Sequence, residues 1–187
     1  LGYNVDGKSF PVRGRECSSQ QIPSIKETFT NYQSFAIADL FDVYGKSNLN
    51  SSLHYSATTF ASMYVENKGA EQTFGFNELP IESQLSCIND FLVKDLNDDG
   101  KLDMIVAGNF YDAEVETPRN DASYGLILLG DGKGGFKAVS PAQSGLYLDG
   151  DIRSMKIIGV KGKDYILLVK NNDYMELVIL GDNLPKL

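Results

Sequence analysis

The spacing of apolar and polar residues divides the chain into three stretches. Residues 1–17 alternate as one or two short strands around a turn at Asp6 and Gly7, and from about 18 to 53 the apolar residues take helical spacing. Beyond Thr58 the pattern consists of short strand-like runs separated by polar turns. We therefore expect a mainly β fold with a helical insertion at about residues 20–53.

Two helices are predicted in the insertion. Pro23 suits the first turn of a helix that carries Ile25 and Phe29 on one side, and Asn31 can cap a second helix that stops at Gly45. The segment is either an arm that binds a partner or an insertion that packs on the sheets. The second helix has its apolar residues at i, i+3, i+4 and i+7, namely Ile37, Leu40, Phe41 and Tyr44.

The rest of the chain reads as strands and tight turns. A strand that ends in a polar turn recurs at Met63, Ile127 and Val178. Four antiparallel strands per unit, repeated around an axis, are typical of β-propeller blades, which bury their faces by stacking, so we expect a partial propeller of about two to three such blades. The predicted strands are 59–66, 73–78, 87–94, 103–108, 124–129, 135–139, 151–159, 164–170 and 174–180.

The charge of the chain restricts the class of partner. The formal net charge is −8 at pH 7, and an acidic surface repels phosphate backbones, so we expect no nucleic-acid partner. No apolar run approaches the roughly 18–20 residues that cross a bilayer, so no transmembrane segment is predicted. Cys17 and Cys87 fit no metal-binding spacing, and both a disulfide and two thiols remain open.

An acidic loop carries the clearest candidate chemistry. Between residues 95 and 103, oxygen-bearing residues stand at alternate positions, and Gly100 permits a sharp turn. This spacing predicts a hard cation, calcium in preference to magnesium, because the shell would be flexible and made largely of protein oxygens. The predicted metal ligands are the side chains of Asp95, Asn97, Asp99 and Asp103 and the backbone carbonyl of Lys101.

Two alternatives compete with this calcium site. An EF-hand needs glutamate at the twelfth loop position and helices on both sides, whereas Val106 holds that position and both flanks read as strands. The EF-hand is therefore excluded. A solvated hairpin turn without an ion remains open.

The acidic loop also carries a family resemblance. Residues 91–110 look like the FG-GAP/VCBS repeat of integrin α-subunit propellers and of many bacterial surface and secreted proteins, and residues 128–136 are similar to its usual ending. With the helical segment and residues 13–17 and 107–111, they resemble the C-terminal part of bacterial VCBS/UnbV-type proteins. The resemblance implies a β-propeller, calcium in its loops, and a location in the periplasm, at the cell surface or outside the cell.

The pattern predicts one propeller fragment over residues 1–187. The chain opens on a strand-like stretch at Leu1, which we interpret as part of a longer protein whose targeting signal lies upstream. The expected segments are strands of a first blade at 1–17, the helical insertion at 18–53, the rest of the first blade at 54–80, a complete FG-GAP/VCBS blade at 87–140 and a last blade at 150–182.

An open stack of blades leaves apolar faces and strand edges bare. We therefore expect one of two outcomes. Either the fragment self-associates through these faces, or its helical segment covers one of them. In the second case, strands within 59–79 bury Phe29, Leu40, Phe41 and Tyr44.

A second polar loop, at 109–123, offers weaker candidate chemistry. Paired carboxylates can act as general acid and base on a glycan, can bind a ligand or a second ion, or can simply be solvated. His54 is the only histidine and no strained nucleophile turn accompanies it, so we expect no Ser- or Cys-based hydrolase. The candidate ligand-binding residues of the loop are Asp112, Glu114, Glu116, Arg119 and Asp121.

These observations predict a non-catalytic, calcium-stabilised binding or scaffold module that lies outside the cytoplasm and binds a protein or a glycan. The alternative is a propeller enzyme that acts on extracellular glycans through the carboxylates of the 109–123 loop.

Overall fold

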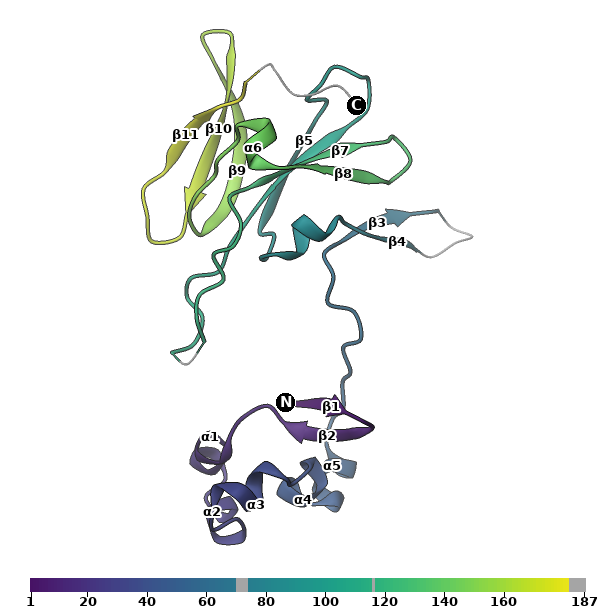
Figure 1. Cartoon of the computed structure of the whole chain (residues 1–187). Coiled ribbons are helices and arrows are strands. Elements are labelled where there is room, and N and C mark those ends of the chain that lie inside the picture. The colour runs from purple at the N-terminus through teal and green to yellow at the C-terminus, as the bar shows by residue number, and fades with distance from the viewer. Residues whose placement is uncertain (70–73, 116, 182–187) are drawn as a thin grey trace. The chain divides into compact units, whose positions relative to one another are not determined.

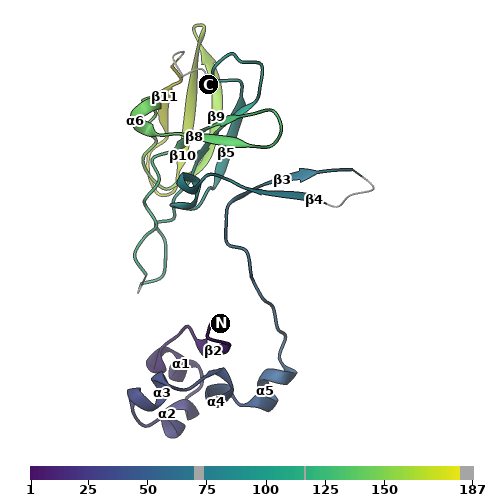
Figure 2. The same ribbon diagram turned by 45° about the vertical axis from the view of Figure 1, so that its right-hand side comes forward.

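The computed structural model describes residues 1–69, 74–115 and 117–181 (Figures 1 and 2). The chain forms two compact units, Leu1–Thr58 and Thr59–Leu187. An exposed stretch without regular secondary structure, which contains His54, lies between the last helix of the first unit and the first strand of the second. We describe each unit by itself.

The first unit combines a short hairpin with five helices. Strands β1 (Gly2–Val5) and β2 (Lys8–Pro11) pair with each other in antiparallel register. A small core of its own contains Ile25, Phe29, Phe35 and Ala38, with Val43 and Tyr44 packed against it. The helices are α1 (Arg15–Gln21), α2 (Ser24–Thr28), α3 (Tyr32–Ala36), α4 (Leu40–Tyr44) and α5 (Lys46–Ser51).

Helix caps explain where the sequence prediction succeeds and where it is wrong. Asn31 caps α3 by accepting a hydrogen bond from the Ser34 N–H, and α4 ends at Gly45 with φ 81°, both as predicted. The predicted single helix between them is instead two helices, because Asp39 starts α4 with a reciprocal capping box to Asp42. The break leaves Ile37 outside both helices and 78% exposed, so the predicted apolar stripe is not continuous.

The second unit is built from three antiparallel sheets. A two-stranded sheet pairs β3 with β4, a four-stranded sheet has the order β5-β6-β7-β8, and a three-stranded sheet has the order β11-β10-β9. The strands are β3 (Met63–Asn67), β4 (Phe74–Glu78), β5 (Asp90–Lys94), β6 (Asp103–Ala107), β7 (Leu126–Gly130), β8 (Phe136–Val139), β9 (Ile152–Val160), β10 (Lys163–Lys170) and β11 (Glu176–Ile179), with short helices η1 (Ile81–Gln84) and α6 (Pro141–Ser144) between them.

The four-stranded sheet is apolar on both faces. Along β7, Ile127 and Leu129 point to one face, and Leu126 and Leu128 point to the other, because successive strand side chains alternate. The first face packs against β9 and β10 through residues such as Ile166, which is fully buried. Tyr64, Leu79 and Ile88 lie against the second face, together with residues such as Phe136 from the sheet's own edge.

Polar side chains join the four-stranded sheet to β9 at the edge strand β5. Asn89 donates through Nδ2 to the Ile152 carbonyl at 2.8 Å and to the Asn109 carbonyl at 2.9 Å. The Asp90 carboxylate accepts from the Met155 N–H at 2.6 Å and from the Ser154 hydroxyl at 3.0 Å. These bonds satisfy polar groups at the junction between two apolar layers.

The expected mainly β fold is confirmed, and it consists of several small antiparallel sheets. The strands of 87–140 form one four-stranded sheet in the predicted order. Among the residues that the structure describes, the sheets do not close into a propeller ring. Residues 1–17 contain the hairpin β1–β2, and residues 54–80 contain the hairpin β3–β4.

The helical side chains named in the sequence analysis differ in burial within the first unit. Phe29 and Tyr44 pack in the core of the first unit, whereas Phe41 is 48% exposed. Within the described parts of the chain, no helix has the length and apolarity needed to cross a membrane.

Candidate functional site

The predicted cation loop connects the antiparallel neighbours β5 and β6. Lys94 and Asp103 face each other at the base of this hairpin. Asp98 and Gly100 take positive φ values of 55° and 82°, which reverse the chain direction within a few residues. The sharp turn expected at Gly100 is therefore present.

Three of the predicted ligands fold around this turn. The Asp99 N–H donates to Asp95 Oδ1 at 3.2 Å and to Asn97 Oδ1 at 3.1 Å, while Asp95 Oδ2 accepts from the Gly100 N–H at 2.8 Å. The Lys101 N–H donates to Asp99 Oδ1 at 2.9 Å and lowers the pKa of Asp99, and the Lys101 ammonium near Oδ2 acts in the same direction. The loop thus gathers the side-chain oxygens of Asp95, Asn97 and Asp99.

Asp103, the fourth predicted side-chain ligand, is hydrogen-bonded to backbone on both sides. It is fully buried, and its two carboxylate oxygens accept from the Leu96 N–H and the Gly130 N–H, each at 2.9 Å. The side chain therefore joins the loop to β7. Over the described ranges, no group of three or more His, Cys, Asp or Glu side chains is arranged to hold a metal ion.

The donor set of the loop nevertheless suits a hard cation. Carboxylate and amide oxygens that accept one N–H retain a second lone pair, and calcium prefers such oxygens. Asn97 is 4% exposed, and its Oδ1 is the atom that could bind a cation, whereas its Nδ2 is a hydrogen-bond donor without a partner among the described atoms. Asp95, Asn97 and Asp99 are the residues that would hold calcium, whereas both Asp103 oxygens already link the loop to backbone N–H groups of Leu96 and Gly130.

The loop at 109–123 is closed at its base by a residue that the sequence analysis missed. Asn109 is 1% exposed and has φ 135°. Its Nδ2 donates to the Ser123 and Gly150 carbonyls, and its Oδ1 accepts from the Ser123 N–H. The sequence signal that could have pointed to Asn109 is its residue type, because asparagine tolerates positive φ and can form hydrogen bonds to nearby backbone.

The predicted ligand-binding residues of this loop are hydrogen-bonded to different neighbours. Arg119 Nε donates to Asp121 Oδ2 at 2.8 Å. Asp112 instead accepts from Asn171 Nδ2 at 2.8 Å, and Glu114 accepts from the Thr117 hydroxyl at 3.0 Å. The prediction for Glu116 lies outside the described residues.

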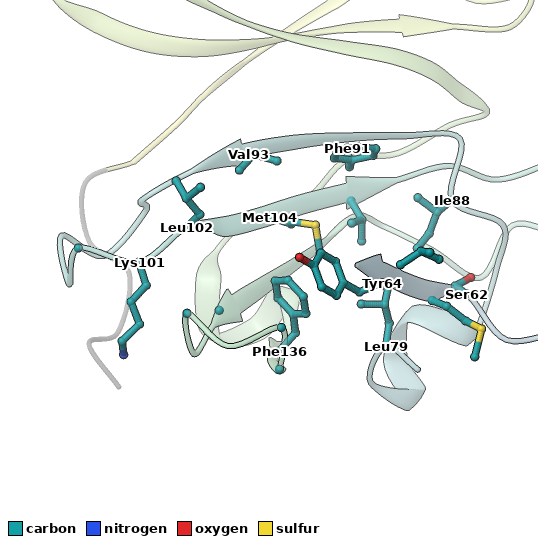
Figure 3. Close-up of a pocket in the computed structure, with 18 residues that line it drawn as sticks. Ser62, Tyr64, Leu79, Ile88, Phe91, Val93, Lys101, Leu102, Met104 and Phe136 are labelled. Atoms are coloured by element: carbon teal, nitrogen blue, oxygen red, sulfur yellow. The ribbon is translucent and has the colours of Figure 1, made fainter. Parts of the chain in front are cut away.

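An apolar groove of about 820 Å³ runs along the second face of the four-stranded sheet. Figure 3 shows the Tyr64 ring beside Met104 and Phe136, and the Tyr64 and Phe136 rings meet edge to face at 5.5 Å. Two of the apolar lining residues are strongly exposed, Phe91 at 57% and Leu102 at 65%. Sequence reasoning missed the groove because it depends on how β3 and the 79–88 segment lie against the sheet.

Comparison with known proteins adds no relative: no family model, no curated protein and no solved structure matches this chain.

Proposed function

We propose that the chain is a non-catalytic binding and scaffold module that acts outside the cytoplasm, with calcium bound in the 95–103 loop and a protein partner bound along the apolar groove. The groove is the observation that carries this proposal. Of its described lining residues, Lys101 is the one charged group, and the rest are apolar side chains, glycines, a serine and the Tyr64 phenol. Such a lining favours burial of an apolar partner surface over proton transfer.

The position of the groove supports a further β-sheet unit as the partner. The opposite face of the same sheet already packs on β9 and β10. A β-sheet bound along the groove would therefore make this sheet the middle one of three layers. The exposed Phe91 and Leu102 extend its apolar surface beyond what β3 covers. In the FG-GAP/VCBS repeats that residues 91–110 resemble, a neighbouring blade would cover this surface.

The contacts of the second polar loop favour binding over glycan hydrolysis. A glycosidase needs two carboxyl groups that face each other across the scissile bond. Asp112 is bonded to Asn171, Asp121 to Arg119 and Glu114 to Thr117, so each of these carboxylates is engaged with a different neighbour.

A groove variant tests the proposed function. In the Phe91→Ser/Leu102→Ser double variant, fluorescence of the apolar dye anilinonaphthalene sulfonate should fall to near the level seen in buffer, because two large, exposed apolar side chains of the groove are lost. Sedimentation should also show less concentration-dependent association than for the wild type. Tyr174→Ser is the matched control, since Tyr174 is 90% exposed and outside the groove. Equal dye binding by the double variant and the wild type would contradict a binding role for the groove.

Calcium binding is tested by melting temperature. With a Kd of roughly 10⁻⁴–10⁻³ M, about 1 mM calcium should stabilise the second unit by about 0.4–1.4 kcal/mol, and a chelator should remove this gain. Asp99→Ala should abolish the calcium-dependent shift. Asp131→Asn is the control, because Asp131 accepts from the Lys133 and Gly135 N–H groups in a similar acidic turn outside the predicted site. No shift in the wild-type protein would identify the 95–103 loop as a turn only.

A further inference from the structure

A cluster of tyrosines lies where the 109–123 loop meets the segment before β9. The rings of Tyr124 and Tyr147 stack at 4.7 Å with 17° between their planes. Their backbones are held side by side, since the Leu148 N–H donates to the Tyr124 carbonyl at 2.9 Å. Tyr124 is 42% exposed and Tyr147 is 58% exposed, so the pair presents aromatic surface to solvent.

Carboxylates surround these rings. Burial raises the pKa of Tyr111, and the negative charges of Asp149, Asp121 and Asp151 raise it further, against the opposing charge of Arg119. Burial also raises the pKa of Tyr147, where Tyr124 and Asp149 act in the same direction. Asp149 directly follows Leu148, whose N–H is bonded to the Tyr124 carbonyl, and stands two residues after Tyr147, so the backbone places it next to the tyrosine pair.

One of the carboxylates is buried and incompletely bonded. Asp151 is 2% exposed, and its Oδ2 accepts from Arg153 Nη2 at 2.8 Å and from the Tyr111 N–H at 3.3 Å. Its Oδ1 has no hydrogen-bond partner among the described atoms. Asn171 connects it to Asp112, because Asn171 Nδ2 lies 2.8 Å from Asp112 Oδ2 and 3.4 Å from Asp151 Oδ2. A buried carboxylate that is paired with Arg153 but has one oxygen without a hydrogen-bond partner thus lies beside Tyr111.

The cluster already binds one cation of its own. The Arg119 guanidinium lies 4.5 Å from the centre of the Tyr111 ring and bonds to Asp121. A guanidinium over an aromatic face with a carboxylate at its edge combines two attractive interactions. Arg119 therefore shows which ligand chemistry this surface accommodates.

Further positive charge is still missing from the cluster. Arg119 is paired with Asp121, and Arg153 with Asp151. In the part of the chain that the structure describes, no ion pair reaches Asp112 or Asp149; Lys170, which also feels the charge of Asp149, is bonded to Glu176. Two carboxylates and an exposed tyrosine pair are thus available to a cation from outside.

We propose that this tyrosine–aspartate surface, made of Tyr111, Asp112, Tyr124, Tyr147 and Asp149, binds arginine side chains of a basic peptide segment. A guanidinium stacks on the exposed tyrosine pair and donates to Asp149, as Arg119 does on Tyr111 and Asp121. Arginine is favoured over lysine because its planar group stacks on a ring and donates in a fixed fork. The site is separate from the apolar groove, so it goes beyond the function proposed above.

The test is fluorescence anisotropy of labelled hexa-arginine titrated with the whole chain. We expect saturable binding that weakens with salt and exceeds the binding of hexa-lysine. Tyr124→Ala/Tyr147→Ala should weaken binding by about 3- to 30-fold, whereas Tyr124→Phe/Tyr147→Phe, which retains both ring faces, should stay close to the wild type. Circular dichroism melting of each variant separates loss of binding from loss of folding.

Matched charge variants separate a defined site from general attraction. Asp149→Asn should weaken hexa-arginine binding more than Asp173→Asn, which removes an equal charge elsewhere, and Phe91→Ser/Leu102→Ser in the groove should leave it unchanged. Equal effects of the two aspartate variants, or no effect of the alanine pair, would overturn the proposal. Tyrosine-dependent binding of cellohexaose without binding of hexa-arginine would also overturn it and would identify a glycan surface.

Discussion

Replacing Asp103 with alanine is expected to destabilise the second unit by about 3 kcal/mol. The carboxylate is fully buried and accepts from the Leu96 and Gly130 N–H groups. Alanine would leave both donors without their acceptor, and a buried unsatisfied polar group costs about 1–3 kcal/mol. Urea unfolding, followed by far-UV circular dichroism, measures the loss.

Two controls connect this loss to the two hydrogen bonds. Asp103→Asn keeps one acceptor oxygen and should lose about half as much stability. Asp173→Ala, at an exposed carboxylate bonded to the Tyr174 N–H, should change stability by less than about 0.5 kcal/mol. The Asp103→Ala loss should be the same with calcium or chelator present. A loss seen only with calcium would make Asp103 a metal ligand and not a structural link to β7.

The second large effect is expected for Gly108→Ala, with a loss of about 3 kcal/mol or more. A Cβ at this position would lie 2.0 Å from the Cys87 carbonyl oxygen and 2.8 Å from the Asn89 nitrogen. Both are backbone atoms, and the Asn89 N–H is bonded to the Ala107 carbonyl, so the neighbours cannot move away without breaking the start of β5. Overpacking of a filled core usually costs about 1–3 kcal/mol, and backbone displacement adds to that cost.

The matched control is Gly159→Ala in β9. A Cβ there would meet only Asp164 Oδ1, at 3.9 Å, and the residue has ordinary strand backbone. Its stability should therefore change by less than about 0.5 kcal/mol. Similar urea midpoints for the two variants would show that the close approach at Gly108 is absorbed by the structure.

Local pattern was sufficient to predict most strands but not all helices. β7 and β10 were both predictable from unbroken apolar runs of strand length, which are Leu126–Leu129 in β7 and Tyr165–Val169 in β10. Helix α1 was missed, since Arg15–Gln21 has no apolar stripe and is held by Arg15, which donates to the Phe29 carbonyl. Helix α6 was also missed, although Ser140 and Gln143 form a readable capping box around Pro141.

The candidate sites, too, were predictable only where the local sequence determines their geometry. The alternation of Asp95, Asn97 and Asp99 predicted that their oxygens would gather, because the turn that gathers them is encoded within the loop itself. The orientation of Asp103 was not predictable, since it depends on Gly130, which the packing of β7 brings beside it. The stacking of Tyr124 on Tyr147 was not predictable either, because the fold brings these two residues together from distant positions in the sequence.

The polar bonds between β5 and β9 have a consequence for how the two sheets are aligned. The hydrophobic effect is non-directional, so the area buried between the two apolar layers does not by itself select one alignment. The bonds of Asn89 to Ile152 and of Asp90 to Met155 do select one, since a shift of one residue would separate donors from acceptors. Asn109 adds a third fixed point at Gly150. The apolar core thus supplies the adhesion between the sheets, and these three side chains set their alignment.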